Sequence, residues 1–69
     1  MTELQKLILK CVAEDRWMDG IDVAHKCNIS IETAYRVTGE LTNMNYIKKQ
    51  YVGISQTRFI ITTIGEQYV

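Results

Sequence analysis

The chain has 69 residues and a mass of 8.0 kDa, which leaves room for one small domain over residues 1–69 and for no second core. Hydrophobic residues make up 46% and charged residues 23%, a composition typical of globular proteins rather than of disordered chains. The longest apolar runs have three residues and no basic leader precedes a hydrophobic stretch, so we expect neither a membrane span nor a signal peptide. The two cysteines, Cys11 and Cys27, make no disulfide framework, which favours a cytoplasmic protein with reduced thiols.

The formal net charge is zero, but the charges are unevenly distributed along the chain. Residues 1–23 carry three basic and five acidic side chains, whereas residues 24–60 carry five basic and two acidic ones. The first segment is therefore negative by two charges and the second is positive by three. Such a domain can present one basic face to a polyanion although its overall charge is neutral.

An amphipathic helix is predicted from Thr2 to about Arg16. Thr2 is a suitable N-cap, and Gln5 stands at the capping-box position three residues later. One apolar stripe follows the helical spacing and consists of Leu4, Leu7, Ile8, Cys11 and Val12. The helix ends before Trp17-Met18, which lead into the turn signal Asp19-Gly20.

A second helix is predicted from about Gly20 to Cys27, capped by Asp19. Asn28 tolerates the left-handed conformation that ends a helix, and Ser30 is a favoured N-cap for the next one. The third helix is predicted over about residues 31–44. Its buried stripe consists of Ala34, Val37, Leu41 and Met44.

The apolar period changes from 3.6 to 2 after the third helix. Residues 46–52 and 57–61 read as two strands of a hairpin around the loop at residues 53–56. Thr62 or Thr63 can then cap a last helical turn that includes Glu66. The fold class is therefore α+β and mainly α, with a core predicted to contain Leu4, Leu7, Ile8, Val12, Ala24, Ile29, Ala34, Val37, Leu41, Ile47, Phe59 and Ile61.

Two short helices joined by a tight turn form a helix-turn-helix unit. The sequence features of such a unit lie in residues 22–30, 33–37 and 41–47. Residues 59–65, close to the hairpin, add a fourth matching stretch. With these residues the chain resembles the winged helix-turn-helix DNA-binding family, and its MarR-like, PadR-like and ArsR-like regulators most closely. The match has departures: Cys27 stands where leucine is usual, Asn28 and Asn45 stand where glycine is usual but preserve the turn, and Thr38 and Gly39 weaken the third helix.

The resemblance implies three helices plus a two-stranded β-hairpin wing, in a sequence-specific transcriptional regulator that binds double-stranded DNA. The third helix would enter the major groove, and the wing, about residues 52–58, would lie on the backbone or minor groove. Arg36 would make a bidentate contact with guanine, and Thr33 and Tyr35 would contact a phosphate or a thymine methyl. The small Gly39 would let the third helix approach the groove closely. The predicted DNA-binding residues are Ser30, Glu32, Thr33, Tyr35, Arg36, Gly39, Asn43, Lys48, Lys49, Ser55, Gln56 and Arg58.

Each assignment has a simpler alternative. Arg36 can be a solvated surface charge, and Lys48-Lys49 can protect a strand edge from aggregation. Cys11 and Cys27 fall on apolar stripes and read as small buried hydrophobes. His25 and Cys27 could hold a metal only with two further ligands, and none is suitably spaced, so we expect neither metal nor cofactor.

We expect no enzymatic activity, because the sequence contains no phosphate-binding loop and no nucleophile–base set. A small-molecule ligand is not expected either, since there is no room for a sensor domain. One recognition helix reads only a few base pairs, which favours a homodimer. Its interface is predicted to use Leu9, Ile64, Tyr68 and Val69. The alternative function is a winged helix that acts as a protein-interaction module without contacting DNA.

Overall fold

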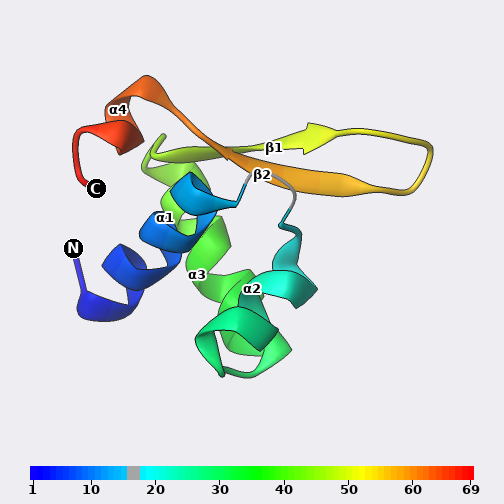
Figure 1. Cartoon of the computed structure of the whole chain (residues 1–69), viewed down its shortest axis with the longest axis horizontal. Coiled ribbons are helices and arrows are strands. Elements are labelled where there is room, and N and C mark those ends of the chain that lie inside the picture. Colours follow the sequence, from blue (N-terminus) through cyan, green and yellow to red (C-terminus); the bar gives the residue numbers. More distant parts are fainter. Residues whose placement is uncertain (16–17) are drawn as a thin grey trace.

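The computed structural model describes residues 1–15 and 18–69, so Arg16, the predicted end of the first helix, and Trp17 lie outside the described residues. A two-stranded hairpin lies above three helices and extends beyond them at one end, while the two termini lie at the opposite end (Figure 1). The elements are α1 (Glu3–Glu14), α2 (Gly20–Cys27), α3 (Ile31–Asn43), β1 (Ile47–Tyr51), β2 (Thr57–Ile61) and α4 (Thr63–Glu66). The predicted order of three helices and a hairpin is confirmed. No helix in these described ranges is long and apolar enough to cross a bilayer.

The first residues of the helices satisfy backbone groups that would otherwise have no partner. Thr2 and Gln5 form a reciprocal capping box at α1, and Asp19 and Asp22 form another at α2. The Ser30 hydroxyl accepts a hydrogen bond from a backbone N–H in the first turn of α3. The three predicted starts are thus confirmed.

Two asparagines make the turns that surround α3. Asn28 has φ 55° and Asn45 has φ 64°, so both occupy the left-handed region. Asparagine tolerates this region better than most residues, because its short polar side chain bonds locally. Asparagine therefore does the work of glycine at both positions, as the sequence predicted.

The core forms where α1, α2, α3 and the hairpin meet. Eight of the predicted core residues are buried, and Leu4, Ile29 and Ile61 are half-buried against them. The buried hydrophobic side chains are Ile8, Leu9, Cys11, Val12, Met18, Val23, Ala24, Ala34, Val37, Leu41, Ile47 and Phe59. Burial of this apolar surface is the main stabilising contribution in so small a domain.

The predictions for four apolar residues were wrong. Leu7 is 46% exposed, whereas Leu9, which was assigned to a dimer surface, is 0% exposed. The reason is that α1 packs against α2, α3 and β2 together, which turns its buried arc toward Leu9. Met44 is the exposed C-cap of α3 rather than a core residue, and Met18 is buried although the sequence placed it in a break.

The end of the chain is fastened to the end of α3. Of the two candidate threonines, Thr62 caps α4 and accepts a hydrogen bond from the Gly65 amide. Its hydroxyl also lies 2.6 Å from the carbonyl oxygen of Asn45, to which it donates. A Cβ atom at Gly65 would collide with the carbonyl oxygen of Tyr46, so α4 can lie this close only with glycine there.

Candidate nucleic-acid interface

The two sides of α3 differ sharply in character. One side is buried in the core through Ala34, Val37, Thr38 and Leu41. The Thr38 hydroxyl donates to the Ala34 carbonyl at 2.8 Å, so this buried polar group is satisfied within its own helix. The other side is exposed or half-exposed and carries all the predicted site residues of this helix and its N-cap, namely Ser30, Glu32, Thr33, Tyr35, Arg36, Gly39 and Asn43.

Gly39 lies on the exposed side of α3 with open space beside it. Within the described part of the chain, and apart from the helix backbone and its chain neighbours, no atom lies within 4 Å of where its Cβ would stand. Glycine in a helix interior costs about 0.5–1 kcal/mol relative to alanine. The fold itself therefore gives no packing reason for glycine at this position.

Arg36 is held loosely by its own helix. Its Nη1 lies 3.3 Å from Oε2 of Glu40, one turn later, and the Arg36 side chain is 60% exposed. The other carboxylate oxygen of Glu40 accepts a hydrogen bond from Gln5 in α1 at 3.1 Å. Exposed pairs of this spacing contribute only about 0.3–0.5 kcal/mol, so the guanidinium can exchange Glu40 for another acceptor at little cost.

Tyr35 is supported by the start of α2. Its ring fills the space that a Cβ at Gly20 would occupy, with the nearest ring carbon 2.5 Å from that position. The side chain is nonetheless half exposed, since one side rests on Gly20 and the remainder faces solvent. The sequence singled out Tyr35 but not the glycine that lets its ring lie there.

The hairpin register separates the two neighbouring lysines. Lys49 is opposite Phe59, whose buried side chain marks the face of the hairpin toward the core. Lys48 is opposite Ile60, on the other face. Only Lys49 lines a hollow of about 270 Å³ together with Gly39 and Asn43 of α3. The structure therefore brings one lysine of the pair to the exposed side of α3 and directs the other away.

A larger hollow of about 530 Å³ continues from there to the wing. Tyr35, Lys49 and Phe59 line both hollows, and Ser55 and Gln56 line the wing end of the larger one. Together the two hollows form a concave strip, which we call the α3–wing groove. It joins predicted site residues from α3, β1 and the hairpin loop.

Arg58 lies further into the hairpin than the sequence suggested. It is half-buried, and its Nε donates to Oε1 of Gln50 on the opposite strand at 2.8 Å. It pairs with Gln50 in the register and therefore shares the face of Lys48 rather than that of Lys49. It still reaches the edge of the α3–wing groove, because it is also among the residues lining the larger hollow.

The tip of the hairpin is apolar, which the sequence analysis did not identify as a feature of the site. Tyr51, Val52 and Ile54 are all exposed, and Ile54 is 107% exposed. The residues between Lys49 and Arg58 carry no charge. Val52 and Ile54 alternate with Gly53 and Ser55 in the sequence. This alternation could have indicated an apolar tip, because a solvated hairpin loop is usually polar.

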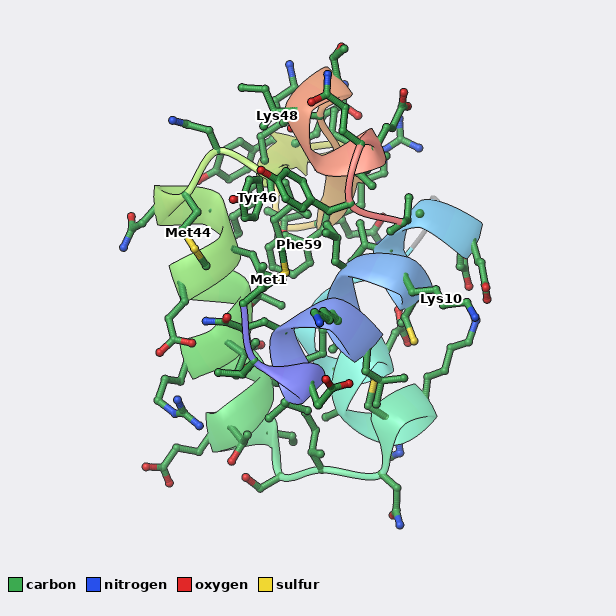
Figure 2. All side chains as sticks on the ribbon, turned by 90° about the vertical axis from the view of Figure 1, so that its left-hand side faces the viewer. Met1, Lys10, Met44, Tyr46, Lys48 and Phe59 are labelled. Atoms are coloured by element: carbon green, nitrogen blue, oxygen red, sulfur yellow. The ribbon has the colours of Figure 1, made fainter. Side chains whose placement is uncertain are left out.

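The end of the molecule that carries both termini is a second exposed region. Ile64, Tyr68 and Val69 are exposed there, as predicted for a dimer surface, but Leu9 is buried and cannot contribute. The Tyr68 ring packs on Tyr46 with ring centroids 4.8 Å apart. Their hydrogen bond raises the pKa of Tyr46 above its ordinary value. Figure 2, which looks onto this end, shows Met1 between α1 and α3, Met44 at the end of α3, and Tyr46 between Met44 and α4.

His25 is exposed on α2, and Cys27 is half-buried rather than buried. Among residues 1–15 and 18–69, no group of three or more histidine, cysteine or carboxylate side chains is placed to hold a metal ion.

No family model matches the sequence. No curated protein matches it either.

Solved structures with the same fold do match. MepR, a transcription regulator of the Staphylococcus aureus multidrug efflux pump MepA, superposes with a TM-score of 0.93 at 17% identity, over 100% of this chain and 53% of that one. S. aureus MarR in complex with salicylate and kanamycin gives a TM-score of 0.87 at 21% identity, over 99% of this chain and 47% of that one. A mutant of S. aureus MepR gives 0.87 at 20% identity, over 100% and 53%.

These similarities establish the fold as the winged helix of the MarR type, which confirms the resemblance at the level of architecture. The chain spans about half the length of the structures it matches.

Proposed function

We propose that the chain is a non-enzymatic, cytoplasmic transcription regulator that binds double-stranded DNA. The α3 helix enters the major groove, and the wing, about residues 52–58, lies along the backbone or minor groove. The observation that carries the proposal is the exposed side of α3, where polar side chains flank a glycine that the fold does not need. A glycine at the centre of a contact surface permits the close approach of another backbone or of bases.

The side chains on the exposed side of α3 and in the α3–wing groove have the chemistry for this task. Arg36 can exchange its weak bond to Glu40 for a bidentate contact with guanine. Thr33 and Tyr35 are placed for a phosphate or a thymine methyl, and Asn43, at the end of α3, for the backbone. Lys49 supplies a positive charge beside them, where a DNA strand would pass between helix and wing.

The wing contributes contact of a different kind. Its tip is uncharged, so Ser55 and Gln56 can offer hydrogen bonds while Ile54 offers apolar surface. Apolar side chains are used by other proteins to contact the floor of the minor groove. The proposal therefore assigns phosphate neutralisation to Lys49, with Lys48 and Arg58 on the far face of the hairpin as secondary candidates.

The fold neighbours support this assignment. MepR is a transcription regulator of a multidrug efflux pump, and all of the present chain superposes on 53% of MepR. The MarR structure contains salicylate and kanamycin, which are ligands of that protein. Our prediction that no small molecule acts on the present chain stays a prediction.

We further propose that the protein binds DNA as a homodimer, because one recognition helix reads too few base pairs to define a site in a genome. The pairing surface is the end of the molecule that carries the termini (Figure 1), where Ile64, Tyr68 and Val69 of α4 and the chain end are exposed. Exposed apolar residues gathered on one face are typical of an interaction surface.

Deleting residues 67–69 should lower the sedimentation mass and the DNA affinity together. A parent chain that sediments as a monomer and binds one non-palindromic site would contradict the dimer.

The direct test of the function is selection of bound sites from a random DNA library, followed by affinity measurement at several salt concentrations. We expect one recurrent, two-fold symmetric sequence, with an affinity that falls steeply as salt rises. The Arg36→Ala variant should weaken binding to the selected site by about 1–3 kcal/mol and relax the preference at one base position. No enrichment, or binding insensitive to salt, would instead favour the winged helix as a protein-interaction module.

A further inference from the structure

Two cysteines from different helices meet at the junction of α1 and α2. The Sγ atoms of Cys11 and Cys27 lie 3.6 Å apart, and both are free thiols. A disulfide has an S–S distance of about 2.05 Å, so the two sulfurs need to approach by only about 1.5 Å. Cys11 is 7% exposed and Cys27 is half-buried, so one thiol can be reached from solvent and the other lies behind it.

We propose that Cys11 and Cys27 form a redox-active pair that low-molecular-weight disulfides close into an intramolecular bond between α1 and α2. The pair differs from an adventitious surface thiol in two ways. Its partner sulfur is already in contact, and the partner is buried on α1, where an external reagent cannot easily compete for it. The proposal does not depend on what the protein binds.

The reaction balances as two successive exchanges. The thiolate of Cys27 attacks one sulfur of the reagent disulfide, which forms a mixed disulfide and releases one reagent thiolate. The thiolate of Cys11 then attacks the Cys27 sulfur, forms the Cys11–Cys27 bond and releases the second reagent thiolate. The protein loses two electrons and two protons, and one reagent disulfide becomes two reagent thiols.

The surroundings of the pair keep the reaction slow at neutral pH. Burial, with the adjacent Cys11, raises the pKa of the Cys27 thiol to about 11. The thiolate is the attacking species, so at neutral pH only a small fraction of the Cys27 thiol is ionised and able to attack a disulfide. The reduced pair is therefore a stable resting state that closes under sustained oxidising conditions rather than within seconds.

Closure should stabilise the domain without altering its exposed groove. The bond would join residues 16 apart in sequence and so restrict the unfolded chain. For a domain of this size we expect the Tm to rise by roughly 10–20 °C. Neither cysteine belongs to α3 or to the hairpin, so DNA affinity should be the same in both redox states.

The test uses the full chain, incubated for hours with excess oxidised glutathione and then freed of reagent. We expect an intact mass lower by two hydrogen atoms, no thiol left for iodoacetamide, a monomer on a non-reducing gel, and a raised Tm that falls back with dithiothreitol. Neither Cys27→Ser nor Cys11→Ala should lose two hydrogen atoms, and Cys11→Ala should instead keep one glutathione on Cys27, because the second exchange needs the Cys11 thiolate. Two glutathione adducts on one chain, chains cross-linked to each other, or a closed bond with an unchanged or lower Tm would overturn the proposal.

Discussion

Gly65 in α4 and Gly39 in α3 are both helical glycines, but their surroundings are opposite. At Gly65 an added Cβ would collide with the Tyr46 carbonyl, so the neighbouring chain segment accounts for the glycine. At Gly39 an added Cβ would meet nothing within 4 Å in the described part of the chain, its own helix apart. One region is closed by the molecule's own atoms, and the other is open.

The two glycines are therefore explained in different ways, one by the fold itself and the other by a partner outside the molecule. Around α4, the cap at Thr62 and the glycine at position 65 are needed for the last turn to dock on the end of α3. On the exposed side of α3, the fold gives no packing reason for Gly39, and Arg36 contributes only a weak ion pair with Glu40. Their choice is best explained by a partner outside the molecule, and the α3–wing groove is where that partner would lie.

The largest expected effect concerns the buried side of α3. Leu41 is fully buried, and Leu41→Ala should destabilise the domain by about 2–5 kcal/mol, because it removes apolar contacts and leaves a cavity. Leu7→Ala is the matched control on α1, since Leu7 is half exposed and the substitution should cost less than about 1 kcal/mol. Chemical denaturation measures both. Equal losses would show that the buried arcs of these helices are assigned wrongly.

The next effect sharpens the description of the closed region. Gly65→Ala should destabilise the domain by about 1–3 kcal/mol, because α4 must move away from the Tyr46 carbonyl. The stacking of Tyr68 on Tyr46 should loosen with it, which tyrosine fluorescence can follow. A Gly65→Ala variant as stable as the parent would mean that α4 does not pack this closely.

A smaller effect tests the division of the two lysines. Lys49→Ala should weaken binding to all DNA sequences and reduce the slope of log affinity against log salt by about one. Lys48→Ala should change both quantities less, because Lys48 lies on the opposite face of the hairpin. The comparison needs the two variants measured across the same salt series. Identical behaviour would contradict the orientation of the groove.

Local signals account for the elements that the sequence predicted well. The helix starts are set by Thr2, Asp19 and Ser30, and the turns by the two asparagines. Each of these residues acts on backbone groups only a few positions away, so its effect can be predicted from the sequence alone. The predicted bounds of the second helix and second strand coincide with α2 and β2. The other helices and the first strand differ by one or two residues at their ends.

The sequence could not determine which flank of α1 would be buried. Ile8, Cys11 and Val12 form the centre of the stripe, and either Leu7 or Leu9 could complete it. The choice is made by the three elements that α1 contacts, which are distant in sequence. The same holds for the site: the candidate residues could be named, but the strand register decided that Lys49 joins α3, that Lys48 faces away, and that Arg58 reaches only the edge of the groove.

The most direct test of the central claim is the double effect of Gly39→Ala. Alanine should raise the free energy of unfolding by about 0.5–1 kcal/mol, because it favours the helix and meets no neighbour. The same substitution should weaken binding to the selected DNA site about tenfold, or about 1.4 kcal/mol, because the added methyl holds the helix away from the bases. Lys10→Ala, exposed on α1, is the control and should leave DNA affinity unchanged. A Gly39→Ala protein that is more stable and binds DNA as tightly as the parent would contradict the account.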